Sequence, residues 1–270
     1  MNGSTAMREV SAYNTAAASD NKIHDDSVAR RFGFRAGLVP GVEVYAYMAH
    51  MPVARWGRAW LERGCAECRF WKPVYDGALA RITAAEESGA LTLTVESAGE
   101  RCATGQASIP SRPPALLIAD AIRPAEPPRD RLPASEESLS HGRALGIVPF
   151  AVDRAMLLGY LTEVRETEPM YLAEELVHPG QILRLANMAL VQNVVLGPWI
   201  HVGSKVNNLA AVHIGQRLAL RSKITSNVVA KGHSIVEFDA VVVADERDVA
   251  QITHTAIWRP RQVSDHSQAA

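Results

Sequence analysis

Several features that mark other protein classes are scarce or missing in this chain of 270 residues. It has three cysteines, an odd number that is too small for a disulfide framework. Its formal net charge of -1 gives no overall electrostatic reason for binding nucleic acid or an anionic membrane surface. No uninterrupted apolar run approaches the roughly 20 residues that span a bilayer, and the start MNGSTAMREV lacks the pattern of a secretory signal. We therefore expect a cytoplasmic protein with neither a nucleic-acid nor a membrane partner.

Motifs for common cofactors are also missing or incomplete. The sequence has no glycine-rich loop of the GxGxxG or GxxxxGK type, so we expect no bound nucleotide cofactor. The stretch CAEC, residues 65–68, has CxxC spacing, but no second close pair of cysteine or histidine ligands accompanies it. This pattern favours two small residues at the start of a strand over a metal site.

Prolines are concentrated in the segment PSRPPALLIADAIRPAEPPRDRLP, residues 110–133. Each proline removes a backbone donor and restricts the residue before it, so this segment is a poor candidate for a central strand or a continuous helix. The composition predicts a linker over residues 110–140 between two units, residues 1–109 and 141–261. The polar tail, residues 262–270, is predicted to be disordered.

The same order of elements occurs on both sides of this linker. LVPGVEVYAYMAHMPVARWG, which begins at Leu38, corresponds to LVHPGQILRLANMALVQNVV, which begins at Leu176. In each, a Pro-Gly step opens a long apolar helix candidate, and proline is well suited to a first helical turn. Strand-like segments around a glycine turn follow each helix, at Gly77 and Gly215. The sequence therefore predicts an α+β unit that occurs twice, each with one long helix and several antiparallel strands.

Four features of the first unit together resemble a known family: His24, the pair Gly33-Phe34, Gly41 and the run RFWKPVYDG at 69–77. The pattern is similar to that of the MaoC-like (R)-specific enoyl-thioester hydratases and dehydratases. The resemblance implies a double hot-dog fold, in which two antiparallel sheets each wrap around a long central helix. It also implies reversible addition of water to a 2-enoyl thioester of coenzyme A or of a carrier protein, with no further cofactor. A homodimer is compatible with this family.

The family's active-site motif, DxNPxH, falls on SDNKIH at residues 19–24. Asn21 and His24 match it, whereas Lys22 replaces the proline, and Ser19 stands at the aspartate position with Asp20 one residue late. The resemblance implies that His24 exchanges the proton, that Asp20 orients it, and that Asn21 holds the loop or the water. A histidine pKa near 6.5 suits this general acid/base role.

The start of the first long helix offers both a catalytic and a structural interpretation. Backbone N–H groups near Gly41 are candidates for stabilising the negative charge that develops on the thioester oxygen. Glu43, in the first turn, either interacts with the helix dipole or serves as the acid of a hot-dog thioesterase. The stretch around His24 also contains the good N-cap residues Asp25 and Asp26, which are typical of a solvated turn. A thioesterase and a non-catalytic acyl-binding protein therefore remain alternatives to the hydratase.

The second unit carries a divergent copy of the motif, ETEPMY at residues 166–171. Pro169 is retained, and Tyr171 stands where the histidine would be. A tyrosine with a pKa near 10 exchanges protons poorly at neutral pH. We therefore predict that only the first unit has a working acid/base site. His178 and His201 lie beside the second helix and a following strand, and the sequence assigns them no role.

Overall fold

The computed structural model describes residues 5–112 and 122–261. Its main feature is a sheet of 11 strands, in the order β1-β3-β4-β5-β2-β10-β13-β12-β11-β7, with β8 pairing with β11 at one edge. The first unit contributes β1 (Thr5–Ser11), β2 (Cys65–Phe70), β3 (Leu79–Glu87), β4 (Ala90–Ser97) and β5 (Glu100–Ser108). The second contributes β7 (Ala144–Gly146), β8 (Phe150–Ala151), β10 (Ile200–Asn208), β11 (Arg217–Ala230), β12 (His233–Ala244) and β13 (Arg247–Arg259).

The two units share this sheet through one antiparallel pair of strands. β2 of the first unit pairs with β10 of the second, from Arg69 opposite Gly203 to Cys65 opposite Asn207. The two predicted sheets are therefore continuous across this junction. The Cys65 and Cys68 side chains lie three residues apart on a regular stretch of β2, so they face opposite sides of the sheet.

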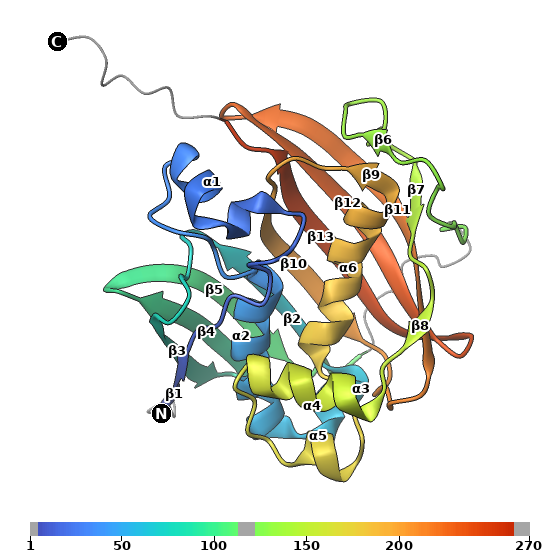
Figure 1. Cartoon of the computed structure of the whole chain (residues 1–270). Helices are drawn as coiled ribbons and strands as arrows, with labels where there is room; N and C mark the ends of the chain where they lie inside the picture. The colour runs from blue at the N-terminus through green and yellow to red at the C-terminus, as the bar shows by residue number, and fades with distance from the viewer. Residues whose placement is uncertain (1–4, 113–121, 262–270) are drawn as a thin grey trace, which may run out of the picture.

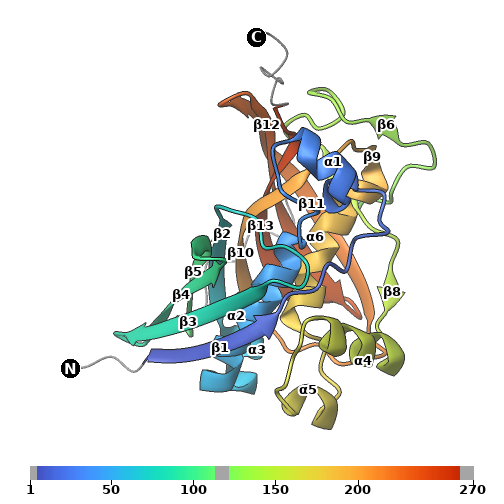
Figure 2. The same cartoon turned by 60° about the vertical axis from the view of Figure 1, so that its left-hand side comes forward.

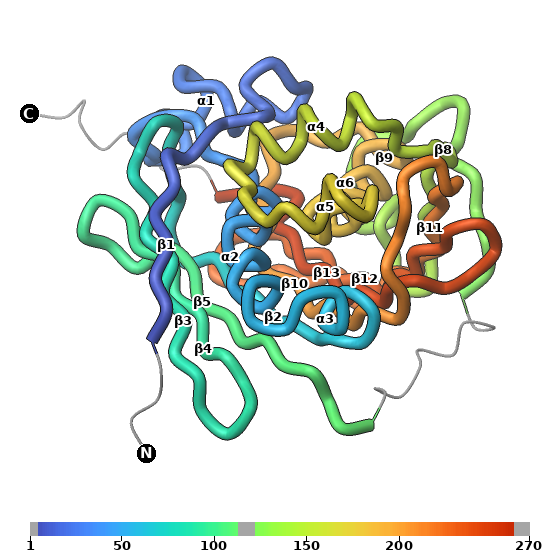
Figure 3. The backbone as a smooth tube through the Cα atoms, turned by 90° about the horizontal axis from the view of Figure 1, so that it is seen from below, coloured from blue at the N-terminus to red at the C-terminus, as the bar shows by residue number. Residues whose placement is uncertain are grey.

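Two long helices, α2 (Gly41–Trp56) and α6 (Pro179–Asn193), lie side by side on the concave face of the sheet (Figures 1 and 2). Both begin at the predicted Pro-Gly steps, and both are apolar on most sides because they are enclosed between the sheet and the shorter helices. Figure 1 shows α4 (Arg154–Glu163) and α5 (Met170–Ala173) at the lower end of α6, and in Figure 3, seen from below, α5 lies in front of α6. The remaining helices are η1 (Lys22–His24), α1 (Asp26–Arg31) and α3 (Arg58–Arg63).

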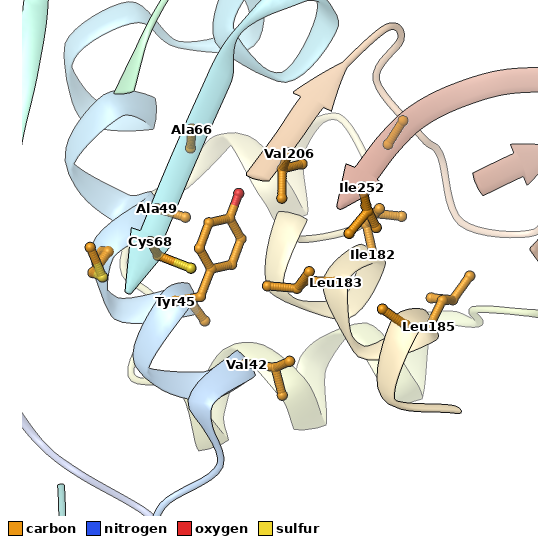
Figure 4. Packing of buried hydrophobic residues seen from close by; sticks show 14 of the residues in the cluster. Val42, Tyr45, Ala49, Ala66, Cys68, Ile182, Leu183, Leu185, Val206 and Ile252 are labelled. Atoms are coloured by element: carbon orange, nitrogen blue, oxygen red, sulfur yellow. The ribbon is translucent and has the colours of Figure 1, made fainter. Parts of the chain in front are cut away.

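Side chains from both units form one hydrophobic core between the helices and the sheet. Tyr45 of α2 packs between Cys68 of β2 and Leu183 of α6, close to Val206 of β10 (Figure 4). The core thus fixes the start of α2, and with it the loop before α2, relative to the second unit.

The close contact of α2 with α6 depends on Gly180. A Cβ atom at this position would lie 2.8 Å from Cβ of Ala46 and would overlap the Tyr160 hydroxyl. Gly180→Ala is therefore expected to lower the free energy of unfolding by about 1–3 kcal/mol through overpacking. Gly159→Ala is the matched control, because Gly159 lies in helix α4 with open space around it among the described residues. That substitution should raise stability by about 1 kcal/mol in a denaturant titration; equal effects of both changes would contradict the packing argument.

The predicted linker over 110–140 is described only in part, because residues 113–121 lie outside the described ranges. Residues 122–131 form neither helix nor strand, and β6 (Leu132–Pro133) pairs with β9 (Val194–Val195) in a separate two-stranded sheet. The predicted disordered tail, residues 262–270, also lies outside the described residues. Within the described ranges, no helix combines the length and the apolar character that a membrane crossing requires.

Candidate active site

The loop before α2 turns twice and places His24 between two capped helices. The Asn21 side chain caps η1 by accepting a hydrogen bond from the backbone N–H of Ile23. The Asp25 carboxylate caps α1, accepting from the N–H groups of Ser27 and Val28 at 2.9 and 3.1 Å. The capping interpretation is therefore correct for Asp25. His24 is the last residue of η1, and its side chain turns towards the start of α2 instead of towards solvent.

Hydrogen bonds define which nitrogen of His24 carries the proton. Its Nδ1 lies 2.6 Å from the carbonyl oxygen of Leu38, and because a carbonyl only accepts, Nδ1 must carry the proton. Nε2 of the neutral ring then has a lone pair. Nε2 accepts a hydrogen bond from the amide nitrogen of Asn21, at 3.2 Å. His24 is thus held by its backbone contact in the tautomer that a general base needs.

The Asn21 amide joins the two units at this point. Its Oδ1 accepts from the backbone N–H of Trp199 at 3.1 Å, and its Nδ2 donates to the Trp199 carbonyl at 3.0 Å. These two bonds fix the orientation of the amide, so the group that faces Nε2 of His24 is Nδ2. Asn21 therefore positions the base and also ties the loop to the segment before β10.

The environment of His24 keeps its ring neutral. Burial lowers the pKa of His24 below the usual 6.5, and the bond to the Leu38 carbonyl opposes this effect only in part. At pH 7 the ring is therefore uncharged and able to accept a proton.

His24, Asn21 and Gly41 line the same cavity, which has a volume of about 290 Å³. Most of its wall is apolar and comes from both units, including Ile23, Phe34, Leu38, Val44, Phe70 and Ile257. The helix α2 begins at this wall, and its N-cap, Pro40, has no side chain that can accept a hydrogen bond. The N–H groups of Gly41 and Val42 have no hydrogen-bond partner in the described part of the chain. They are the free donors expected at a helix N-terminus.

A wider groove of about 850 Å³ adjoins the cavity and shares His24, Asn21, Pro40 and Trp199 with it. Asp20 lies on the wall of this groove and is exposed. No hydrogen bond joins Asp20 to His24 among the residues that the structure describes. The structure therefore brings three of the four predicted site residues together in the cavity, and it places the fourth, Asp20, on the groove outside.

Glu43 lies on the same groove but is committed to an ion pair. The side chain is only 1% exposed, and its Oε1 lies 2.6 Å from a guanidinium nitrogen of Arg184 on α6. Thr15 also donates to Oε1, at 3.2 Å. Burial raises the pKa of the Glu43 carboxyl, whereas Arg184 and Thr15 oppose this change. Glu43 thus links the two long helices.

Sequence reasoning missed one polar residue of the cavity and left another unassigned. Asn187 lines both the cavity and the groove, and its Oδ1 is buried without a partner in the described residues. It is a polar position in an otherwise apolar stretch of α6, and this is the only signal that the sequence offers. His201 of β10 also lines the cavity and is buried.

The divergent motif of the second unit forms a buried cluster around Glu166. The Glu166 carboxylate lies 2.7 Å from Nδ1 of His50 and 3.3 Å from Nε2 of His178. Arg8 lies 3.8 Å away. Burial alone would raise the pKa of Glu166, but the hydrogen bonds from His178 and His50 outweigh it and lower this pKa. His178 accepts a bond from the N–H of Gly180 through Nδ1, so its ring must be neutral.

Tyr171, at the histidine position of that motif, has no acid/base partner. Its ring packs 4.8 Å from that of His178, and its buried hydroxyl makes no hydrogen bond to another described residue. Tyr171→Phe should leave turnover intact and raise the free energy of unfolding by about 1 kcal/mol, because it removes an unsatisfied buried group. Tyr47→Phe is the control, since the Tyr47 hydroxyl accepts a bond from the N–H of Tyr13 at 3.1 Å and its loss should destabilise the protein. A drop in turnover with Tyr171→Phe would contradict the assignment of the site to the first unit.

Known structures share this architecture over nearly the whole chain. A protein from Chloroflexus aurantiacus assigned as a MaoC domain dehydratase is 11% identical, with a TM-score of 0.66 over 97% of this chain and 96% of that one. A conserved protein from Mycobacterium tuberculosis with a double hotdog fold is 17% identical, with a TM-score of 0.65 over 95% and 96%. A protein from Lactobacillus plantarum assigned as an oleoyl thioesterase is 12% identical, with a TM-score of 0.53 over 96% and 98%.

These likenesses confirm the predicted double hot-dog fold. At such low identity they establish the fold alone. No protein-family model matches the chain, and no curated protein is significantly similar to it in sequence.

Proposed function

We propose that the protein is an acyl-thioester hydratase or dehydratase in which His24 is the general base. The observation that carries this proposal is that a proton acceptor and an unpaired hydrogen-bond donor line one largely apolar cavity. The Nε2 lone pair of His24 and the unpaired N–H of Gly41 both belong to this cavity. A proton acceptor beside an oxyanion donor is what the addition of water to a 2-enoyl thioester requires. The MaoC-like dehydratases among proteins of this fold support the proposal by analogy.

The proposed reaction follows from the positions of these groups. His24 takes a proton from water through Nε2, and the water oxygen forms a bond to C3 of the enoyl group as the C2–C3 double bond opens. The negative charge passes to the thioester oxygen, where the N–H of Gly41 stabilises it. His24 then returns the proton to C2, so that one water molecule has been added and the ring is neutral again. Dehydration is the reverse sequence.

Asn21 and Asp20 have unequal parts in this proposal. Asn21 positions the ring of His24 and the attacking water through its fixed amide. Asp20 orients the loop from the groove, where it is exposed and acts through solvent. An exposed charge contributes at most about 1 kcal/mol, so Asp20→Asn should reduce turnover by no more than about fivefold.

The size of the cavity limits the acyl chain. A volume of about 290 Å³ is at the lower end of ordinary ligand pockets, which favours a short enoyl group. The adjoining groove leads away from His24 and offers space for the thiol carrier, coenzyme A or the arm of a carrier protein. We propose no cofactor beyond the thioester's own carrier. We also propose that the protein is cytoplasmic and forms a homodimer.

A thioesterase is the second candidate, and Glu43 is the observation that favours it. The Oε2 atom of this carboxylate is buried and has no partner among residues 5–112 and 122–261. However, Arg184 holds the other oxygen in an ion pair at 2.6 Å, so the carboxylate is committed to the contact between the two helices. Removal of the Glu43 charge should therefore affect the contact of α2 with α6 more than the chemistry.

The test is a panel of enoyl, 3-hydroxyacyl and saturated acyl thioesters of coenzyme A with two to eight acyl carbons. Each thioester is assayed both for water addition or loss and for thiol release. The proposal expects interconversion of the short enoyl and 3-hydroxyacyl thioesters without thiol release. Thiol release that Glu43→Gln abolishes would favour the thioesterase, and binding without any turnover would favour an acyl-binding protein.

A further inference from the structure

At the wall of the cavity, three polar side chains of the second unit, His201, Ser204 and His254, form a buried hydrogen-bonded cluster. Nε2 of His201 lies 2.8 Å from Oγ of Ser204, and this Oγ lies 3.0 Å from Nδ1 of His254 on β13. The two imidazole rings stack with their centroids 4.2 Å apart. All three side chains are at most 5% exposed. The mechanism proposed above uses none of them.

A β-bulge accounts for this arrangement. Residues three apart on a regular strand face opposite sides of the sheet, so His201 and Ser204 should point apart. The pairing of β10 with β13 shifts between His201 and Gly203, which adds one residue to β10 at this point. The extra residue brings the two side chains to the same face, next to His254.

One member of this hydrogen-bonded cluster, His201, lines the cavity near the start of α2. Nδ1 of His201 has no hydrogen-bond partner in the described part of the protein, although the residue is buried, with only 5% of its surface exposed. A Cβ atom on Gly41 would lie 2.8 Å from this nitrogen. His201 therefore places an unpaired nitrogen beside Gly41, whose backbone N–H the proposed reaction uses.

The hydrogen bonds of His201, Ser204 and His254 allow two arrangements of their protons. Burial lowers the pKa of His201 to about 3 and that of His254 well below 6.5, so each ring carries one proton at neutral pH. The Ser204 hydroxyl donates to one ring and accepts from the other. If it donates to His254, then Nε2 of His254 carries a proton; if it donates to His201, then Nδ1 of His201 does.

The surroundings of His254 favour the second arrangement. Its Nε2 is buried and has no hydrogen-bond partner within the described residues, and the centroid of its ring lies 5.1 Å from that of Phe238. Each arrangement leaves one buried ring N–H without an acceptor among the described residues, on Nε2 of His254 in the first and on Nδ1 of His201 in the second. The second arrangement places this N–H on a residue that lines the cavity, where a ligand oxygen can accept it.

We propose that Nδ1–H of His201 is a second donor to the substrate carbonyl oxygen at the start of α2, and that Ser204 and His254 hold the ring in this tautomer. The inference rests on the proposed function, because the acceptor is the thioester oxygen. A neutral imidazole can donate to an oxyanion without the cost of burying a charge. The oxygen would then be held by Gly41 from one unit and by His201 from the other.

The tautomer can be measured in the free protein by two-bond ¹H–¹⁵N spectra after labelling with [¹⁵N]histidine. The chain has nine histidines, and the signals lost in His201→Asn identify those of His201. We expect these signals to show a proton on Nδ1, and Ser204→Ala should shift them towards the other tautomer. Ser222→Ala is the matched control, because Ser222 is equally buried but donates to the Leu145 carbonyl elsewhere. A proton on Nε2 of His201 in the free protein would overturn the inference.

Addition of crotonyl coenzyme A separates this inference from the proposed function. The inference expects the Nδ1 signal of His201 to move together with the signals of His24. A response of His24 without one of His201 would overturn the inference and leave the proposed function standing. If neither residue responds, both the proposed function and the inference fail.

Turnover of crotonyl coenzyme A gives the third readout. His201→Leu should lower the turnover number by about 10²- to 10³-fold, as expected for the loss of one oxyanion donor. His201→Asn should retain most activity, since the amide nitrogen of asparagine occupies nearly the position of Nδ1. Equal losses in the two variants, with the fold intact, would contradict a donor role.

Discussion

Replacement of His24 by alanine is expected to lower the turnover of a short 2-enoyl thioester by about 10²- to 10⁴-fold, the usual effect of losing a general acid/base. The reason is local, because Nε2 of His24 is the proton acceptor that the Leu38 carbonyl and the Asn21 amide hold at the cavity. Steady-state kinetics on crotonyl coenzyme A measures the effect. The loss should appear mainly in the turnover number, because the apolar wall still binds the acyl group.

His141→Ala is the matched control for this substitution. His141 is an exposed histidine in the loop before β7, far from the residues of the cavity in the sequence. The His141→Ala variant should retain full turnover. An unimpaired His24→Ala enzyme would contradict the hydratase proposal and return the loop to a capped turn.

The pH dependence of the rate gives an independent check on the same residue. The base must be neutral, and burial holds the pKa of His24 below 6.5. Turnover should therefore stay level as the pH falls from 8 towards 6.5 and decline only as the pH passes through this lowered pKa. A decline centred above 6.5 would contradict the assignment, as would the same acid limb in the residual activity of His24→Ala.

Glu166→Gln is expected to lower the free energy of unfolding by about 3–5 kcal/mol, the usual cost of removing one partner of a buried ion pair. The Glu166 side chain is 1% exposed, and the substitution leaves Arg8 without its nearest negative charge. Glutamine has only one acceptor oxygen, so one of His50 and His178 also faces an amide NH2 in place of its acceptor. The measurement is a denaturant titration at neutral pH.

Acidification should produce a related loss in the wild-type protein. The folded pKa of Glu166 lies below that of the unfolded chain, so its contribution is complete above about pH 4.5 and is lost as the pH falls below this value. Glu62→Gln is the control, because Glu62 pairs with Arg58 at 44% exposure and such pairs contribute about 0–1 kcal/mol. Similar losses in the two variants would show that the buried cluster has no special role.

The sequence alone was sufficient to predict the fold and to name three residues that the structure brings together in one cavity. The Pro-Gly steps at Gly41 and Gly180 mark the two long helices, and their nearly equal spacing from the glycine turns at Gly77 and Gly215 indicates a duplication. His24, Asn21 and Gly41 were predicted to act together, and all three line one cavity. Local patterns were informative here because helix starts and turns depend mostly on neighbouring residues.

The remaining features depend on contacts between distant parts of the chain. Pairing of β2 with β10 brings His201 to Gly41, and the bulge that orients His201 leaves no recognisable trace in the sequence. The position of Asp20 on the groove follows from the turn at Asn21, which is fixed by the backbone of Trp199 in the other unit. Spacing along the chain cannot reveal which of two adjacent residues such a turn exposes.

Oxygen exchange at C3 tests the central claim most directly. 3-Hydroxybutyryl coenzyme A is incubated with the protein in oxygen-18 water, and mass spectrometry locates the label in the recovered thioester. The account predicts that wild-type protein introduces oxygen-18 into the 3-hydroxyl group through reversible dehydration, and that His24→Ala does so at least about a hundredfold more slowly. Label found only in a released carboxylate, or equal exchange by wild type and His24→Ala, would contradict it.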